Sequence, residues 1–198
     1  MNSKPQYFDR RADFWRSHFE SALSWKDYLT SGDPDYAKQW EELNCLIPPL
    51  TKEEKSRLGN LNRQLNILVY CGFWCGDCVR QGPMLHHIAS AGSSIDLRFI
   101  DRESSEELQD ECRILGALRV PIVIFLSEDY HEVTRFGDRH LSVYRTKLRR
   151  DRGEITTPPE FPPPKEELGV EQNEWIDLVE RALIMLQLAP PLRARHKD

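Results

Sequence analysis

Two cysteines, Cys75 and Cys78, are separated by two residues in the segment Trp-Cys-Gly-Asp-Cys at residues 74–78. They follow an apolar run at residues 67–71 and precede a helix-like segment at residues 79–91. A cysteine in the first turn of a helix lies beside backbone N–H groups and the positive end of the helix dipole, which lower the pKa of its thiol. The second thiol can then close a small disulfide with the first. Strand, C-x-x-C and helix in this order predict thiol–disulfide redox chemistry.

The composition is that of an ordinary globular chain of 198 residues, 39% hydrophobic and 30% charged. Its net charge of −5 gives no electrostatic reason to expect nucleic acid as a partner. No apolar run approaches the roughly 20 residues that cross a bilayer, so we expect no membrane partner. The N-terminus is polar and has no h-region, so we expect no secretion, and the five cysteines are irregularly spaced. A reducing, cytoplasmic setting fits these features best.

The first sixty residues predict helices. Apolar residues at helical spacing predict an amphipathic helix over residues 8–29, which Ser-Gly-Asp-Pro at residues 31–34 should break. A second helix is predicted over residues 34–44. One side of it should carry Tyr36, Trp40 and Leu43.

A third, short helix is predicted from its end signals. Thr51 and Glu54 form a capping-box pair, and Gly59 can end the helix. We expect residues 1–60 to be a helical extension packed on the main domain, because their apolar faces need a partner.

The main domain is expected over residues 61–150. Strands are predicted at residues 66–73, 95–101, 122–126 and 131–136. Ser104 and Glu107 should cap a helix that stops at Gly116, and a helix over residues 139–150 should cover one sheet face. Strand, helix, strand, helix, strand, strand predicts an α/β fold with a central mixed sheet flanked by helices.

The C-terminal part, residues 151–198, should be a proline-rich strap and a helix. Five prolines in residues 156–164 predict an extended segment. An amphipathic helix should follow, closed by Pro190 and Pro191, with Trp175, Val179, Ala182, Leu183 and Leu186 on its apolar side. The basic stretches at residues 145–152 and 193–197 are interpreted as a solvated helix face and a flexible tail.

A proline before a later strand completes a recognisable pattern. Pro121 lies in Arg-Val-Pro-Ile at residues 119–122, Pro83 follows Cys78 by five residues, and Gly137 lies near the last predicted strand. With the Trp-Cys-Gly-x-Cys core, these residues resemble the thioredoxin family. The resemblance covers residues 61–150, and it implies a thioredoxin-like fold in which Pro121 is a cis-proline facing the disulfide.

The resemblance also implies roles for individual residues. Cys75 would be the attacking thiolate, and Cys78, more buried, the resolving thiol. Trp74 would flank and shield the site. Pro121 would keep a metal from bridging the two sulfurs and would present a backbone edge to a partner. The other supporting residues are Gly76, Asp77 and Val120.

Three positions depart from the family pattern. Val69 stands where thioredoxins carry a buried acid, and Leu97 where they carry the lysine that pairs with it. Asp77 replaces a proline. Its carboxylate should raise the pKa values of both thiols, or it could itself shuttle the proton that the missing acid would handle.

Paired cysteines also occur in metal centres. Structural zinc commonly uses four ligands, and the chain has a single C-x-x-C, so we expect no metal. Cys71, Cys75 and Cys78 have the spacing of the cluster motif in radical-SAM enzymes, but Cys71 lies inside a predicted strand, so we expect no cofactor. Cys71, Cys45 and Cys112 are interpreted as core residues, with a third redox thiol as the alternative for Cys71.

The functional hypothesis is a thiol–disulfide oxidoreductase that reduces protein disulfides and receives electrons from an upstream donor such as a reductase. The alternative is a non-catalytic adaptor or redox sensor, whose C-x-x-C would switch a partner contact made by the helical extension.

Overall fold

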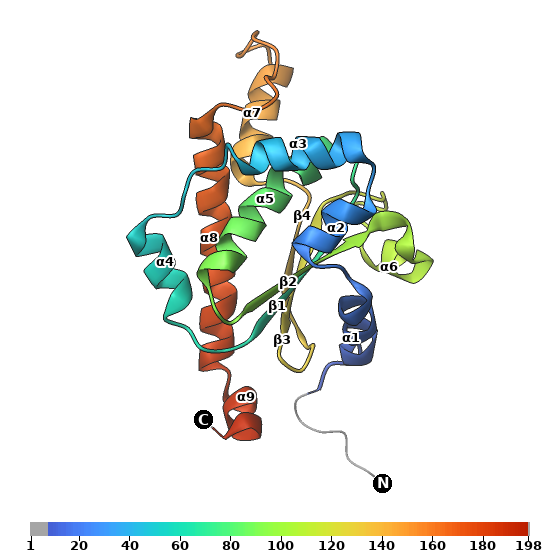
Figure 1. The fold of residues 1–198 in the computed structure, drawn as a ribbon, viewed down its shortest axis with the longest axis vertical. Helices are drawn as coiled ribbons and strands as arrows, with labels where there is room; N and C mark the ends of the chain where they lie inside the picture. Colours follow the sequence, from blue (N-terminus) through green and yellow to red (C-terminus); the bar gives the residue numbers. More distant parts are fainter. Residues whose placement is uncertain (1–7, 198) are drawn as a thin grey trace.

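The computed structural model describes residues 8–197, and within them a four-stranded mixed sheet has the order β2-β1-β3-β4 (Figure 1). The strands are β1 (Leu65–Cys71), β2 (Ile95–Asp101), β3 (Ile122–Ser127) and β4 (Glu132–Gly137). β1 pairs parallel with β2 and antiparallel with β3, and β3 pairs antiparallel with β4. The predicted α/β fold with a central mixed sheet is confirmed.

Two helices cover one face of the sheet. They are α5 (Gly76–Ala91) and α8 (Lys165–Leu188). Trp175 of α8 is fully buried and packs on Phe125 and Phe136 of the sheet, as the apolar stripe of this helix predicts. The opposite face carries α1 (Ala12–Ser21), whose buried Trp15 lies under the guanidinium of Arg135.

The single helix predicted over residues 8–29 is wrong. The chain forms α1 and then α2 (Trp25–Ser31), with an extended step between them. Leu23 exchanges two backbone hydrogen bonds of 2.8 Å with Phe99 of the edge strand β2, and the side chain of Ser24 caps α2. Pairing with a sheet edge therefore outweighs the helical periodicity here.

The next two helices follow their predicted signals. They are α3 (Pro34–Asn44) and α4 (Lys52–Gly59). The capping box of Thr51 and Glu54 is confirmed. Tyr36, Trp40 and Leu43 lie on one side of α3, as their spacing predicts. Trp40 and Leu43 are buried, whereas Tyr36, in the first turn, is 38% exposed.

The helix predicted from Ser104 to Gly116 is shorter than expected. A 3₁₀ turn at Arg102–Ser104 precedes α6 (Glu106–Glu111), whose N-cap is Ser105. The chain then turns back, because Leu115 and Gly116 have positive φ and the backbones of Ile114 and Ala117 exchange two hydrogen bonds of 3.0 Å. A turn with two left-handed residues stops the helix before Gly116.

The helix α7 (Leu141–Asp151) does not cover the sheet as predicted. None of its eleven residues is buried, whereas nine residues of α8 are. Figure 1 shows α7 reaching past the end of the sheet while α8 runs along its face. The sheet face is covered by the longer helix, because α8 carries the apolar stripe.

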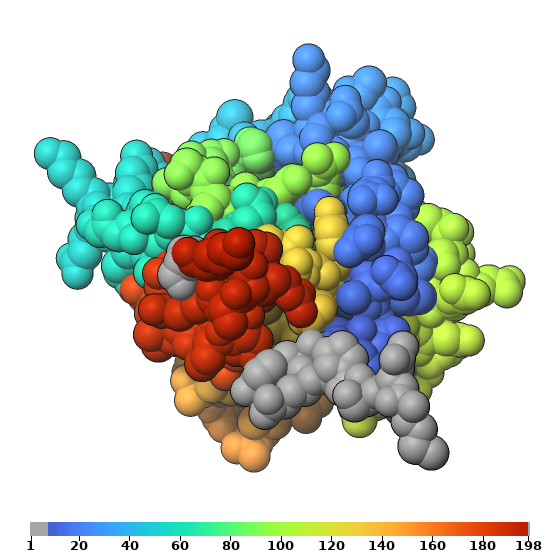
Figure 2. Space-filling view, turned by 90° about the horizontal axis from the view of Figure 1, so that it is seen from below, coloured from blue at the N-terminus to red at the C-terminus, as the bar shows by residue number. Residues whose placement is uncertain are grey.

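The helix α8 ends at Leu188, just before Pro190 and Pro191, as predicted. The two prolines then begin α9 (Pro190–His196), since proline suits the first turn of a helix. Figure 2 shows the C-terminal helices and α1 on the two sides of the β3–β4 hairpin. No helix within residues 8–197 is both long and apolar enough to cross a membrane.

The division at residues 60 and 150 stays a proposal about domain organisation. Side chains from all three segments, among them Trp15, Phe125 and Trp175, belong to one hydrophobic core. The helices before β1 therefore position the loop that follows it.

Candidate active site

Cys75 is the N-cap residue of α5 and is half-buried. Its pKa is lowered to about 7, first because the Cys78 thiol donates a hydrogen bond to its sulfur and then because the backbone N–H groups of Cys78 and Asp77 do so. Burial opposes this shift but is the weaker effect. A substantial fraction of Cys75 is therefore thiolate at neutral pH, as an N-terminal helix position favours.

Cys78 lies one turn into α5 and is 1% exposed. Burial raises the pKa of its thiol well above the ordinary range, and the backbone N–H of Gly72 donates a 3.5 Å hydrogen bond to its sulfur. The two thiols therefore differ in protonation at neutral pH: Cys75 is accessible and acidic, while Cys78 is buried and holds its proton.

The loop before β3 faces Cys75. The Val120–Pro121 peptide bond is cis, and the Cys75 sulfur lies 3.6 Å from the carbonyl oxygen of Val120. Gly137 of β4 packs against this loop, because a Cβ at that position would lie 2.9 Å from the Pro121 oxygen. The chain thus brings Val120 and Pro121, far from the C-x-x-C in sequence, next to its first sulfur.

Trp74 and Gly76 form the solvent side of the site. The Trp74 side chain is 50% exposed, so it flanks the site without closing it. Its ring lies under the Arg102 guanidinium at 4.8 Å and against Gly72, where a Cβ would lie 3.0 Å from the indole. A Cβ on Gly76 would meet nothing within 4 Å, so the start of α5 is open to an approaching molecule.

Three aromatic residues, Tyr28, Trp40 and Phe73, hold the loop after β1; we call them the aromatic clamp. Their rings pack together, with Tyr28 and Phe73 at 4.6 Å. The indole N–H of Trp40 donates a 3.1 Å hydrogen bond to the carbonyl of Phe73. Trp40 also lies directly on α5 at Gly82, where a Cβ would come within 2.9 Å of the ring atom Cη2. The helices α2 and α3 therefore fix the position of the C-x-x-C.

Four charged residues, Asp77, Arg80, Arg139 and Glu171, lie on the other side of α5; we call them the charge network. Asp77 forms an ion pair with Arg139 and lies 3.7 Å from Nη2 of Arg80. Nε of Arg80 lies 3.2 Å from Oε1 of Glu171 on α8. Two cations therefore face the Asp77 carboxylate.

Asp77 raises the pKa of Cys75, as predicted, but its contribution is minor. The Cys78 thiol and the backbone N–H groups outweigh it, so the net pKa of Cys75 is lowered. The two arginines beside Asp77 partly neutralise it. For Cys78, the cause of the raised pKa is burial and the neighbouring thiols.

Glu171 was not singled out from the sequence. It is 2% exposed, and burial raises its pKa to about 7 against the opposing effect of Arg80. One signal was present: Glu171 follows Leu168 by three residues and precedes Trp175 by four, so it interrupts the apolar stripe of α8. Val69 and Leu97, where thioredoxins carry the acid and lysine, are apolar and buried here.

The other three cysteines differ from Cys75 and Cys78 in burial and in the partners of their thiols. Cys71 and Cys112 are buried, and burial raises the pKa of each thiol. The thiol of Cys71 donates a 3.2 Å hydrogen bond to the hydroxyl of Tyr28. Cys45 is exposed, so its interpretation as a core residue is wrong. Among residues 8–197, no group of three or more His, Cys, Asp or Glu side chains is arranged to hold a metal.

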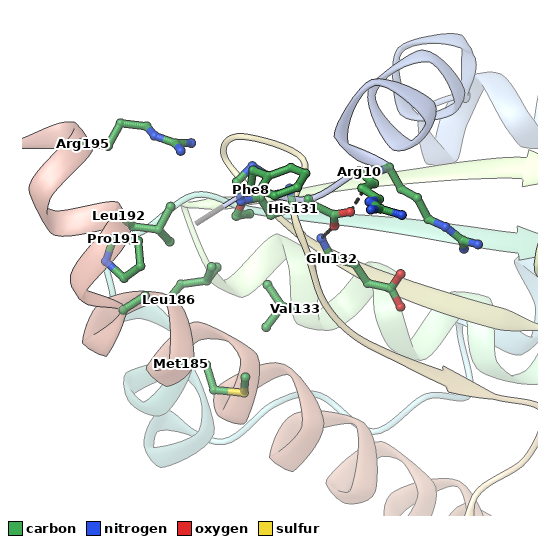
Figure 3. Close-up of a pocket in the computed structure, with 14 residues that line it drawn as sticks. Phe8, Arg10, His131, Glu132, Val133, Met185, Leu186, Pro191, Leu192 and Arg195 are labelled. Carbon is green, nitrogen blue, oxygen red and sulfur yellow. Dashed lines mark hydrogen bonds between the residues drawn. The ribbon is translucent and has the colours of Figure 1, made fainter. Parts of the chain in front are cut away.

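A separate cavity of about 670 Å³ lies at the other end of β3. Leu186 and Leu192 of the C-terminal helices line one side and Val133 of β4 the other, with Arg195 at the rim (Figure 3). Because Cys75 lies beside Val120, before β3 begins, this cavity is not part of the dithiol site.

Comparisons with known proteins agree with the geometry. A family model described as thioredoxin matches residues 22–146, more than half of the chain. The match begins before α2 and so includes the helices that carry the aromatic clamp. No curated protein matches the chain.

Two solved structures show the same fold at low identity. A protein of unknown function from Pseudomonas aeruginosa matches with a TM-score of 0.66 and 17% identity, over 85% of this chain and 96% of that one. An HIV epitope-scaffold matches with a TM-score of 0.66 and 18% identity, over 85% and 96%. A Fasciola hepatica thioredoxin matches 45% of this chain and 82% of its own, with 21% identity and a TM-score of 0.34.

Proposed function

Because the chain belongs to the thioredoxin family, whose model matches residues 22–146, we propose that it is a thiol–disulfide oxidoreductase that reduces protein disulfides through Cys75 and Cys78. A redox function of the thioredoxin type follows from the family in general. The observation that supports the specific dithiol is the difference between the two thiols: Cys75 is accessible with a pKa lowered to about 7, and the pKa of buried Cys78 is raised.

The proposed reaction has two steps. The Cys75 thiolate attacks one sulfur of the substrate disulfide, so a mixed disulfide forms and the other substrate sulfur leaves as a thiolate. Cys78 then loses its proton, which the departing substrate thiolate can accept, and attacks the Cys75 sulfur. The substrate's second thiol is released, the substrate is reduced by two electrons, and Cys75 and Cys78 form a disulfide. An upstream electron donor such as a reductase would restore the dithiol, in a reducing cytoplasmic setting.

The loop around cis-Pro121 would position the substrate. The Val120 carbonyl lies 3.6 Å from the attacking sulfur, so a substrate chain running along this loop would bring its disulfide to Cys75. Trp74 is exposed beside it and offers an apolar contact. The proton-shuttle role of Asp77 would compete with its ion pair to Arg139.

Substitution of single cysteines tests the proposal. With insulin as the disulfide substrate and dithiothreitol as the reductant, Cys75→Ser should abolish catalysed reduction, because the nucleophile is lost. Reduced Cys78→Ser, mixed with insulin after dithiothreitol is removed, should instead accumulate the mixed disulfide, seen as an increase in mass. Cys45→Ser removes an exposed thiol and is the matched control, with an unchanged rate. Full activity of Cys75→Ser would refute the proposed mechanism.

The adaptor or sensor function is kept as the second candidate, because the aromatic clamp contacts the loop that leads from β1 to Cys75. The Trp40 indole holds the carbonyl of Phe73, two residues before Cys75. Oxidation of the dithiol could therefore change the surface of α3. Partner binding that depends on the oxidation state, without turnover of insulin, would favour this function over the enzyme.

A further inference from the structure

The helix α7 projects beside the dithiol, with one side against α8 and its other sides exposed. Its base is anchored, since the hydroxyl of Ser142 donates a 2.6 Å hydrogen bond to Glu174 of α8 and the hydroxyl of Tyr144 donates one to Asp138. The structure describes all eleven residues from Leu141 to Asp151, and none of them is buried. A helix of this length with no buried residue is not held by a core, so its exposed side chains are available to a partner.

The charge of this helix is opposite to that of the whole protein. Residues 139–152 contain six Arg or Lys and one Asp, in a chain of net charge −5. Four of these cations have no carboxylate within ion-pair distance among residues 8–197: Arg145, Lys147, Arg150 and Arg152. Lys147 and Arg150 line a pocket with Glu166 and Glu167 of α8, which offset part of their charge. The exposed cations Arg145 and Arg152 create a local positive potential that attracts acidic groups.

An apolar row runs between these cations. Leu141, Tyr144 and Leu148 are 56%, 42% and 47% exposed. They are spaced by three and four residues, so they lie on one side of the helix. A ligand that matches both features carries apolar and acidic groups at helical spacing, which is the description of an acidic amphipathic segment.

The base of α7 adjoins the proposed catalytic thiol. Tyr144 binds Asp138, and Asp138 accepts a 3.0 Å hydrogen bond from Arg119. Arg119 is two residues before cis-Pro121, and the carbonyl of the intervening Val120 lies 3.6 Å from the Cys75 sulfur. A chain lying on α7 would therefore reach the Val120 loop and Cys75.

We propose that α7 is a docking arm for an acidic amphipathic segment of the protein disulfide that Cys75 attacks. The proposal rests on the proposed function of the dithiol and adds the class of its substrate. Nucleic acid is a poorer match, because phosphates make no apolar contacts with the row and the rest of the chain is acidic. A second copy of the chain is also poorer, because two α7 helices would repel each other.

Two peptides of equal length test the proposal. Each contains one intramolecular disulfide and one amphipathic helix, with Glu at the polar positions of the first peptide and Lys at those of the second. The reduced protein is mixed with each peptide, and the oxidation of Cys75 and Cys78 is followed by alkylation and mass. Each rate is divided by the rate of the same variant with hydroxyethyl disulfide, which is neutral and too small to reach α7.

The variant Arg145→Glu/Lys147→Glu/Arg152→Glu should lower the rate ratio of acidic to basic peptide by about tenfold at low salt, because electrostatic steering contributes at least that much to association. The effect should shrink in 0.5 M salt. The matched control, Lys26→Glu/Lys52→Glu/Lys55→Glu, changes the net charge equally at exposed positions of α2 and α4 and should leave the ratio unchanged. A ratio equal in both variants would overturn the docking arm.

Failure of the docking arm and failure of the proposed function are distinguishable. A wild-type protein that reduces hydroxyethyl disulfide but treats both peptides alike retains the function and loses the docking arm. A protein that reduces none of the three loses the function, and the docking arm with it. Fluorescence anisotropy with labelled peptides and a labelled DNA duplex adds a direct readout. Binding of the duplex that depends on α7, without such binding of the acidic peptide, would assign the arm to nucleic acid and overturn the proposal.

Discussion

The two sides of α5 hold the same helix by different physical means. On one side the rings of the aromatic clamp pack against Gly82 and the loop after β1, and Trp40 donates one buried hydrogen bond. On the other side the charge network places two arginines beside the carboxylates of Asp77 and Glu171. One side is shape and apolar burial, and the other is charge in a partly buried setting.

The difference separates stability from reactivity. Burial of apolar surface stabilises a fold by about 25 cal/mol per Å², whereas a buried ion pair is roughly neutral once the charges lose their water. We therefore expect the aromatic clamp to contribute most of the stability of the fold around the site. The charge network should govern how stability and thiol reactivity respond to pH. Three substitutions test this contrast.

The largest effect is expected from Trp40→Ala. The side chain is fully buried, so its removal should lower the free energy of unfolding by about 3–5 kcal/mol. Urea denaturation measures this value. Tyr36→Ala, on the same helix but 38% exposed, should stay within about 0.5 kcal/mol of the wild type. A cost for Trp40→Ala below about 1 kcal/mol would place the stabilising contacts elsewhere.

A pH-dependent effect is expected from Glu171, which Arg80, Asp77, Glu174 and Glu167 face. Its pKa is raised from 4.5 to about 7 in the folded protein, so the folded state binds a proton more tightly than the unfolded state. The stability that protonation provides is complete below pH 4.5 and is lost as the pH rises through about 7.

Glu171→Gln has no such loss. Its free energy of unfolding relative to the wild type should therefore rise by up to about 3 kcal/mol between pH 4.5 and 8, measured by urea denaturation across that range. Glu166→Gln, an exposed residue of the same helix, is the control and should keep a constant difference within about 0.5 kcal/mol. A constant difference for Glu171→Gln as well would remove Glu171 from the pH response.

The smallest effect is expected from Asp77→Asn. Asp77 raises the pKa of Cys75, and its removal also frees Arg80 and Arg139 to act on the thiolate. The pKa of Cys75 should fall below about 7, so its alkylation by iodoacetamide at pH 6 should accelerate roughly two- to fivefold. Asp110→Asn, an exposed residue of α6, should leave the rate unchanged. A slower rate for Asp77→Asn would mean that the carboxylate assists the thiolate instead.

Local signals predicted many elements correctly. The strands, the capping box of Thr51, the start of α3 and the buried stripe of α8 all follow from patterns within a few residues. Two of the errors share a cause: a partner distant in sequence decided the outcome. Leu23 leaves the helical pattern because Phe99 pairs with it, and α7 lies off the sheet because α8 occupies the face.

The sequence by itself determined the redox pair, its place between a strand and a helix, and the family to which it is similar. These depend on the order of residues along a short stretch and on backbone groups at a helix start, which any such stretch provides. The tertiary structure alone decided what surrounds the pair. Asp77 meets Arg139 and Arg80, Arg80 meets Glu171, and Trp40 meets Gly82 only because the sheet brings separate elements together. Charge and burial at a point in space are sums over neighbours from the whole chain, and burial of this kind raises the pKa of Cys78.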